Sequence, residues 1–285
     1  MKLVSYKSPG GDNSFGLVNG DGIVDLRERL RLPDLKALLS AGVENALAFA
    51  VAPTDYKLSD VQLLPPIPNP AHIFGIGYNT HSHLKEAAAF FKKEMPVPEY
   101  PTVFLRIAES QVGHGAPLVS PSVSGTLDYE GEVAVVIGKP GRYIKRADAL
   151  AHIAGISCYN DGSVRGYQLH SSQVTPAKNF PSSGSFGPWL VTLDEVGPLD
   201  ELQMKTRING EQRQHLVMSD LCFDFAQLIE YVSQPFQLQP GDVFVTGSPA
   251  GIGAIQGHYL RPGDVVEIDV QNVGTLRNTV VAEAT

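Results

Sequence analysis

Residues Ser124–Lys139 read SGTLDYEGEVAVVIGK, and this stretch combines an apolar strand with a cluster of acids. Its second half, Val133–Ile137, is an unbroken and mostly β-branched apolar run, which predicts a strand buried on both faces. Its first half places Asp128, Glu130 and Glu132 at alternate positions. Side chains two apart on a strand point to the same side. The pattern therefore predicts up to three carboxylates on one side of the chain where it enters a core.

These carboxylates need a compensating positive charge. Burying an unpaired carboxylate costs several kcal/mol, and like charges at close range raise one another's pKa. A hard divalent cation is a suitable partner because it prefers carboxylate oxygens. The spacing alone also fits a solvated strand edge, or pairing with Arg or Lys.

The composition is that of a large, β-rich globular chain. Only 18% of the 285 residues are charged and 43% are hydrophobic, whereas an average globular protein is about 25% charged. The length suits one large domain, or one large and one small domain. The 28 Gly and 21 Pro residues favour many turns.

The totals also exclude several classes of partner. The net charge of −8 and the lack of a basic patch with interleaved aromatics argue against nucleic acid. No run of about 18 apolar residues and no signal-peptide core is present, so we expect neither membrane insertion nor export. Cys158 and Cys222 are far apart in apolar surroundings and are predicted to be reduced, which favours a cytoplasmic protein.

Residues 1–65 are predicted to form a small N-terminal α+β domain with a structural role. Lys2–Tyr6 alternates like a strand, and Phe15–Leu26 has Asn-Gly-Asp-Gly at its centre, which is typical of a hairpin turn. Two short helices are expected at Pro33–Ser40 and Val43–Val51. The proline-rich segment that follows, Leu64–Pro70, is stiff and extended and predicts a boundary before a larger domain at 70–285.

A candidate base follows the next predicted strand, His72–Tyr78. His83 and Glu86 are three residues apart in a segment of helical composition, so they share a face and can touch. A carboxylate beside an imidazole orients it, which is the arrangement that a general base needs. An ordinary solvated helix face is the alternative.

Further polar residues lie at the ends of other predicted strands. Asp161 follows a buried strand, Arg165 and Gln168 project from the next turn, and Lys178 lies in a serine-rich loop. Residues 246–253 form a glycine-rich loop after another strand, whose N–H groups are suited to an anion. Each segment alone is ordinary turn or loop sequence.

Together these segments resemble one known family. Seven of them occur in a fixed order along the chain: Gly75–Glu86, Leu127–Gly138, Asn160–Gln168, Ala177–Phe180, Gly187–Trp189, Asn209–Glu211 and Thr246–Gly253. This order is similar to that of the fumarylacetoacetate hydrolase (FAH) family, from about residue 72 to the C-terminus. The resemblance implies an α+β, β-rich fold, an FAH-type mixed β-sandwich roll with a small N-terminal α+β domain, and a homodimer.

The resemblance also implies roles for individual residues. The metal, Mg²⁺ or alternatively Mn²⁺ or Ca²⁺, is expected on Glu130, Glu132 and Asp161. The expected catalytic residues are His83, Glu86, Lys178 and Gln168, and the expected substrate-binding residues are Arg165, Ser248 and Tyr78. The chain departs from the family pattern at Thr80, Gly162, Val164 and Ser248, where Tyr, Val, Ala and Thr are usual, and these departures bear on substrate identity.

The predicted function is metal-dependent hydrolysis of a carbon–carbon bond in a 2,4-dioxo acid (acylpyruvate or fumarylpyruvate type) or a related β-diketone. His83, oriented by Glu86, would activate water, and Lys178 and Gln168 would stabilise the oxyanion. The alternatives on the same scaffold are an oxo-acid decarboxylase, a tautomerase or isomerase, and a dehydratase. A metal-stabilised binding protein without turnover is a further alternative.

Overall fold

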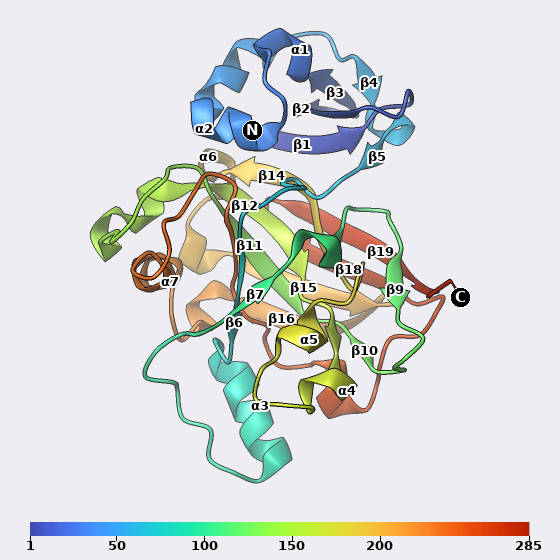
Figure 1. Cartoon of the computed structure of the whole chain (residues 1–285), viewed down its shortest axis with the longest axis vertical. Helices are drawn as coiled ribbons and strands as arrows, with labels where there is room; N and C mark the ends of the chain where they lie inside the picture. Colours follow the sequence, from blue (N-terminus) through green and yellow to red (C-terminus); the bar gives the residue numbers. More distant parts are fainter. Residues whose placement is uncertain (285) are drawn as a thin grey trace.

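The computed structural model describes residues 1–284 and contains three sheets. The large sheet runs β4-β3-β2-β1-β14-β12-β11-β17-β6-β7, with β5 beside β1 and β8 beside β14 (Figure 1). Its strands are β1 (Lys2–Lys7), β2 (Asn13–Asn19), β3 (Gly22–Asp25), β4 (Tyr56–Lys57), β5 (Gln62–Leu63), β6 (Ile73–Gly77), β7 (Thr102–Arg106), β8 (Gln111–Val112), β11 (Gly131–Ile137), β12 (Ile153–Asn160), β14 (Gly184–Thr192) and β17 (Val243–Val245).

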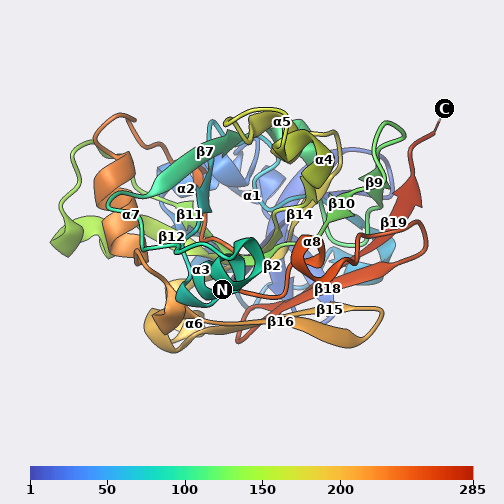
Figure 2. The same cartoon turned by 90° about the horizontal axis from the view of Figure 1, so that it is seen from below.

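A second sheet of five strands packs against one face of the large sheet (Figure 2). Its order is β16 (Glu211–Val217), β15 (Gln203–Ile208), β18 (Val265–Val270), β19 (Gly274–Ala282) and β9 (Leu118–Ser120). The third sheet pairs β10 (Leu127–Asp128) with β13 (Ser163–Val164). This layering confirms the β-rich α+β fold class.

The helices are short and lie between the strands. The α-helices are α1 (Arg27–Leu30), α2 (Leu35–Ala41), α3 (His81–Phe91), α4 (Arg165–Gln168), α5 (Thr175–Lys178), α6 (Leu193–Val196), α7 (Phe225–Val232) and α8 (Gly253–Gln256). The 3₁₀ helices are η1 (Val43–Phe49), η2 (Leu58–Asp60), η3 (Ala108–Ser110), η4 (Arg146–His152), η5 (Leu199–Glu201) and η6 (Met218–Asp220). The second N-terminal helix expected from the sequence is thus a 3₁₀ helix, which begins after Gly42 at a positive φ of 106°.

Strand β11 lies at the centre of the large sheet and is buried along its whole length. It pairs with β12 on one side and with β17 on the other. Val133 and Val135 face a core shared with the five-stranded sheet, whereas Ala134 and Val136 face a core shared with the N-terminal segment. The prediction of a strand buried on both faces is confirmed.

The N-terminal segment extends the large sheet rather than standing apart from it. Strand β1 pairs with β2 and also with β14, so the sheet continues from the first strands into the centre (Figure 1). The hairpin predicted within Phe15–Leu26 is present as β2 and β3, with Asn19 opposite Gly22. The domain boundary predicted at residues 65–70 stays a prediction. The chain on its two sides shares a sheet and a core, and this arrangement does not require either side to fold independently.

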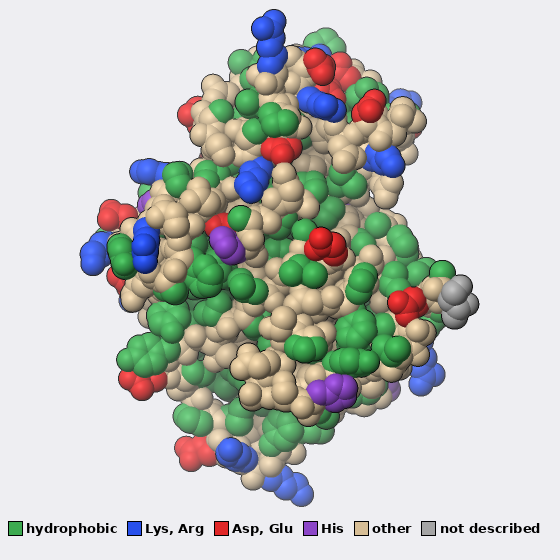
Figure 3. All heavy atoms as spheres, viewed as in Figure 1, with side chains coloured by type: hydrophobic (Ala, Val, Ile, Leu, Met, Phe, Trp, Pro, Cys, Tyr) green, Lys and Arg blue, Asp and Glu red, His purple; other side chains and the backbone are tan. Residues whose placement is uncertain are grey.

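The helices and one face of the surface can be described in the terms used for the sequence. None of the helices within residues 1–284 is long and apolar enough to cross a bilayer. Lys and Arg side chains are scattered among Asp and Glu over the face shown in Figure 3. Cys158 is buried and Cys222 half-buried, and both are free thiols.

The burial of β11 makes its side chains sensitive to truncation. Val135 is 0% exposed, so we expect Val135→Ala to lower the free energy of unfolding by roughly 1.5–3 kcal/mol, through lost apolar burial and the cavity left behind. Val123→Ala makes the same chemical change at a residue that is 64% exposed and should cost less than about 0.5 kcal/mol. Denaturant unfolding of both variants in EDTA checks this, and equal losses would contradict the central position of β11.

Candidate metal centre and active site

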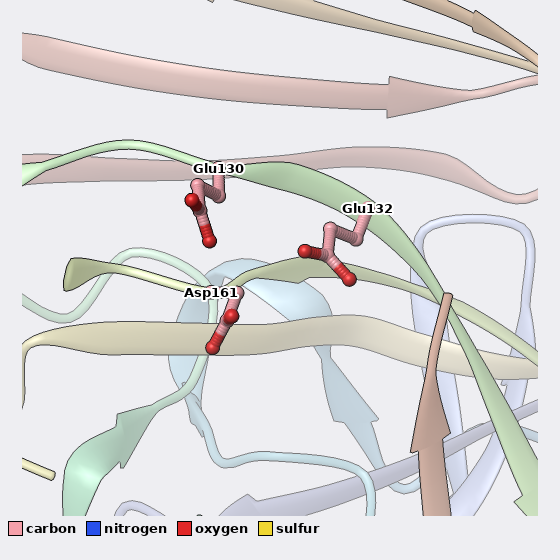
Figure 4. Close-up of side chains that lie close together, drawn as sticks. All are labelled: Glu130, Glu132 and Asp161. Carbon is pink, nitrogen blue, oxygen red and sulfur yellow. The ribbon is translucent and has the colours of Figure 1, made fainter. Parts of the chain in front are cut away.

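Three acidic side chains converge at one end of β11 and β12. Glu130 directly precedes β11, Glu132 lies in it, and Asp161 directly follows β12 (Figure 4). All three are buried, and each offers an oxygen within 4.8 Å of the others. The main chain explains this proximity, because Glu132 is opposite Tyr159 in the ladder and the Asp161 N–H donates to the Glu130 carbonyl at 2.8 Å.

The glycine between the two glutamates is required by close packing. A Cβ on Gly131 would lie 1.9 Å from the Thr206 hydroxyl oxygen, so the five-stranded sheet leaves no room for a side chain. From the same sheet, Gln214 accepts the Gly131 N–H at 2.9 Å and donates to the Ser248 hydroxyl at 2.7 Å. The second sheet therefore positions both the acidic strand and the glycine-rich loop.

Asp128 lies apart from the other acids, although its spacing suggested a shared face. The strand is interrupted after β10, and Asp128 turns to accept N–H groups from Gly253 at 2.8 Å and Ala254 at 2.9 Å. It also accepts from the Arg165 Nε at 2.8 Å. The third carboxylate of the cluster comes from Asp161, as the family resemblance implied.

Three buried cations surround the four acids. Arg165 donates through Nη2 to Glu130 at 2.5 Å and through Nη1 to the Gln168 side chain at 2.9 Å. Lys178 donates to Glu130 and, at 2.5 Å, to Oδ2 of Asp161. Arg106 donates to Oδ1 of Asp161 at 2.5 Å.

The buried charges do not balance. Four carboxylates (Asp128, Glu130, Glu132 and Asp161) face three cations (Arg106, Arg165 and Lys178). Of these four acids, Glu132 alone has no ion pair within residues 1–284, and it accepts the Gly247 N–H at 2.6 Å. With all four acids ionised, the site carries one uncompensated negative charge.

The pKa values of the two glutamates move in opposite directions. Burial raises the pKa of Glu132 well above its usual range, and the nearby Asp161 and Glu130 carboxylates raise it further. Burial also acts on Glu130, but the charges of Arg165 and Lys178 outweigh it and hold the pKa of Glu130 well below its usual range. Glu132 is therefore the acid that most needs an added cation.

The glycine-rich loop binds anions, and those anions are the protein's own carboxylates. Besides the Gly247 bond to Glu132 and the Gly253 bond to Asp128, the Gly251 N–H donates to Glu86 at 2.9 Å. Helix α8 begins in this loop at Gly253. These three N–H groups of the loop therefore orient carboxylates of the protein itself.

Helix α3 brings His83 to the same place. Nδ1 of His83 lies 3.5 Å from Oε2 of Glu86, and neither atom has a hydrogen bond of normal geometry within residues 1–284. Thr80 begins the helix by accepting the His83 N–H at 3.2 Å and ties it to the loop by donating to the Ser248 carbonyl at 2.9 Å. The Tyr78 ring stacks on the His83 ring with centroids 6.0 Å apart.

One cavity of about 70 Å³ joins these groups. Most of the predicted site residues line it, along with Phe104, which the sequence had not indicated. Those predicted residues are Tyr78, His83, Glu130, Glu132, Asp161, Gln168, Lys178 and Ser248. All of the lining residues follow residue 70, so the N-terminal segment contributes none.

Two predicted site residues, Glu86 and Arg165, contact residues that line the cavity but do not line it themselves. Glu86 contacts the loop and His83, in agreement with an orienting role. Arg165 was predicted to bind substrate, but its guanidinium is shared among Asp128, Glu130 and Gln168, and it does not line the cavity. Its role in substrate binding stays a prediction, and its contacts are those of a residue that positions carboxylates.

Arg106 was not predicted from the sequence because it reads as the ordinary end of strand β7.

Two of the departures from the family pattern have a structural reason. Thr80 is the fully buried N-cap described above, and a Cβ on Gly162 would lie 1.8 Å from the Ser183 carbonyl oxygen. Neither change is therefore read as a change in substrate contact.

The family comparison agrees with this site. The family described as fumarylacetoacetate (FAA) hydrolase C-terminal matches residues 72–281. The chain belongs to the FAH family. The oxaloacetate tautomerase YisK of Bacillus subtilis is 38% identical over 229 residues, covering 79% of this chain and 75% of the relative. The human mitochondrial oxaloacetate tautomerase FAHD2A is 33% identical over 294 residues, covering 99% and 92%.

Solved structures of FAH-family enzymes cover the whole chain. The maleylpyruvate hydrolase from Sphingobium sp. SYK-6, in complex with manganese(II) and pyruvate, superposes with a TM-score of 0.83 at 27% identity and full coverage of both chains. A putative HpcE protein from Mycobacterium smegmatis superposes with a TM-score of 0.87 at 31% identity, again over both full chains. This chain is accordingly an FAH-family metal-dependent enzyme.

The residues present fit a divalent metal. Three buried carboxylates with oxygens within 4.8 Å supply the hard donors that Mg²⁺ and Mn²⁺ prefer. Glu132 gives a second observation, since it is buried without an ion pair within residues 1–284 and a cation there would relieve the excess negative charge. Glu130, Glu132 and Asp161 are thus the residues that would hold it.

Metal binding should release a proton from Glu132. An acid with a raised pKa stays protonated at pH values where an ordinary Glu is ionised, so the proton competes with the metal there. We expect Mg²⁺ affinity to rise with pH above the ordinary Glu pKa of about 4.3 until Glu132 is ionised, with about one proton released per ion within that window. Calorimetry in two buffers of different ionisation enthalpy measures this release.

Glu132→Gln should abolish the proton release and most of the affinity. Glu28→Gln, at an exposed position in α1, is the matched control and should change neither. Binding heats that do not depend on the buffer in the wild-type protein would contradict the prediction.

Proposed function

We propose that this enzyme catalyses keto–enol tautomerisation of a small, oxaloacetate-like 2-oxo acid with the help of a divalent cation. The observation that carries this proposal is that the acidic triad, Lys178 and His83 line one small cavity. The similarity to oxaloacetate tautomerases over 79% and 99% of the chain supports it.

The charge of the site favours an anionic substrate. With a divalent cation added, the four buried carboxylates and three buried cations described above would carry one net positive charge. One of the two carboxylates of an oxaloacetate-like acid would neutralise it, and in so small a cavity an unmatched charge is costly. The cavity of about 70 Å³ also favours a short substrate over a bulky one.

Each residue has a definite part in the proposed reaction. His83 removes a proton from C3 of the 2-oxo acid, and the electron pair moves onto the C2 oxygen as the enolate forms. The Glu86 carboxylate lies 3.5 Å from Nδ1 of His83 and orients the ring, which leaves Nε2 as the base. Lys178 donates a hydrogen bond to the developing oxyanion. Return of the proton from His83 to that oxygen completes the enol and restores the neutral imidazole, and the reverse sequence returns the ketone.

The remaining groups orient and enclose the substrate. Gln168, Ser248 and Tyr78 line the cavity, and Tyr78 covers the His83 ring at its mouth, where it is 40% exposed. The bound cation, which we propose is Mg²⁺ with Mn²⁺ or Ca²⁺ as alternatives, supplies Lewis-acid polarisation of the 2-oxo group.

Hydrolysis of a carbon–carbon bond is the second candidate. The likeness to a maleylpyruvate hydrolase over the full chain favours it. In that reaction His83 takes a proton from water, the hydroxide adds to the remote carbonyl, and the carbon–carbon bond then breaks. The electron pair leaves as the enolate of pyruvate, and a carboxylic acid is the other product.

One assay separates the two reactions. Ultraviolet absorbance follows the decay of the enol of oxaloacetate and, separately, of a simple acylpyruvate, each with Mg²⁺ and with EDTA. Metal-dependent ketonisation of oxaloacetate without loss of carbon supports the tautomerase. Metal-dependent conversion of the acylpyruvate to pyruvate and a carboxylic acid supports the hydrolase instead. Activity on neither compound would contradict both candidates.

His83 should be essential for turnover but not for metal binding. We expect His83→Ala to lower kcat by about 10²- to 10⁴-fold, as for loss of a general base, while the Mg²⁺ affinity changes by less than about twofold. His81→Ala is the matched control because His81 is an exposed residue on the same helix. Equal losses of turnover and metal affinity in His83→Ala would remove His83 from the role of base.

A further inference from the structure

Lys178 is held by an element that has little stability of its own. It is the last residue of α5, a helix of four residues, and the preceding segment 169–173 is exposed. A single helical turn is not stable in isolation, because nucleation costs more than one turn of hydrogen bonds returns. Something outside α5 must therefore keep the Lys178 ammonium group on Glu130 and Asp161.

The next residue, Asn179, makes that connection. Its Oδ1 accepts the Ile107 N–H at 2.8 Å, and its Nδ2 donates to the Leu105 carbonyl at 3.1 Å. The same Nδ2 donates to the Thr175 carbonyl at 2.9 Å, which caps α5. One carboxamide thus satisfies the end of the helix and also fastens it to β7.

The bonds to β7 imitate the pairing of a neighbouring strand. Strand β7 is the last in the large sheet, so one of its edges has no strand beside it. The Leu105 carbonyl and the Ile107 N–H flank Arg106 and point to the same edge, as alternate main-chain groups of a strand do. Asn179 fills that position, and α5 lies beside β7 in Figures 1 and 2.

Strand β7 in turn carries two contacts of the site. Arg106 bonds Oδ1 of Asp161 while Lys178 bonds Oδ2, so the two cations hold opposite oxygens of one carboxylate. The Phe104 ring lies 5.1 Å from the Lys178 ammonium group, and it packs over Gly75, where a Cβ would lie 2.3 Å from the ring. The register between α5 and β7 therefore fixes where the ammonium group lies.

Arg106 does not depend on this connection. Its guanidinium also donates to the Gly162 carbonyl at 3.2 Å and to the Ser183 and Ser110 hydroxyls, each at 3.3 Å. Within residues 1–284, Lys178 has only its two carboxylates and the Phe104 ring. Loss of Asn179 should consequently displace Lys178 and leave Arg106 in place.

We propose that Asn179 is a positioning residue that fastens α5 to β7 and thereby fixes the Lys178 ammonium group over Glu130 and Asp161. Its consequence for turnover rests on the proposed function, in which Lys178 contacts the substrate oxyanion. Its consequence for metal binding does not, because Glu130 and Asp161 are the acids that Lys178 and the cation would share.

The first test measures Mn²⁺ affinity by calorimetry. Lys178→Met removes a positive charge beside the cation and should tighten Mn²⁺ binding about tenfold. Asn179→Ala loosens the same charge without removing it and should tighten binding by a smaller factor, about threefold. An unchanged Mn²⁺ affinity in Asn179→Ala would overturn the proposal.

A double-mutant cycle then asks whether Asn179 acts through Lys178. In the Lys178→Met background, Asn179→Ala should have no further effect on Mn²⁺ affinity, because the group that it positions is gone. Additive effects would show a general loss of structure and would overturn the proposal.

A control variant separates the assigned contact from a general folding defect. Asn45→Ala removes two carboxamide-to-carbonyl bonds of the N-terminal segment, at 2.9 Å each, and should leave Mn²⁺ affinity unchanged. A change in Mn²⁺ affinity as large as that in Asn179→Ala would overturn the proposal.

Kinetics separate this proposal from the proposed function. If the oxo acid is turned over, Asn179→Ala should lower kcat about tenfold or more through Lys178, with little further loss in Lys178→Met. If no oxo acid is turned over but the Mn²⁺ cycle is non-additive, the positioning role stands and the proposed function fails. If turnover occurs and the Mn²⁺ cycle is additive, the proposed function stands and the positioning role fails.

Discussion

The burial of four carboxylates, three in one cluster and Asp128 linked to them through Arg165, is the constraint on which the rest of this site depends. Asp128, Glu130, Glu132 and Asp161 are each less than a tenth exposed. Their mutual repulsion and loss of hydration would prevent folding without nearby positive charge and N–H donors. Three buried cations and the main-chain N–H groups of the loop at residues 246–253 meet most of this need. The remainder, centred on Glu132, is what a divalent cation would neutralise.

The groups that bond these carboxylates come from several elements of the chain after residue 70. The loop after β17 orients Glu132, Glu86 and Asp128 through its N–H groups. The five-stranded sheet contributes Gln214, which bonds the main chain of Gly131 and the hydroxyl of Ser248. Each of these groups bonds an acid or the strand that carries it. The packing of the two sheets therefore sets the geometry of the site. A change in either one is expected to disturb the other.

Local signals in the sequence predicted local structure correctly. The apolar run Val133–Ile137 predicted the buried strand, and the Asn-Gly-Asp-Gly turn predicted the hairpin between β2 and β3. The spacing of His83 and Glu86 predicted a shared helix face. Reasoning from alternation was wrong for Asp128, because the strand is interrupted after it and its side chain turns to the loop at Gly253. Arg106 carried no local signal at all, since a charged residue at a strand end is ordinary.

The sequence by itself determined the class of fold, the family and the set of polar residues available for chemistry, because these follow from local patterns and from the order of motifs along the chain. The tertiary structure alone decided which charges meet. Lys178 and Asp161 are 17 residues apart, Arg106 and Asp161 are 55 apart, and Glu132 and Gly247 are 115 apart. Such contacts depend on sheet order and register, which no short segment encodes. Asn179 shows the same limit, since its part in holding Lys178 appears only when α5 lies against the open edge of β7.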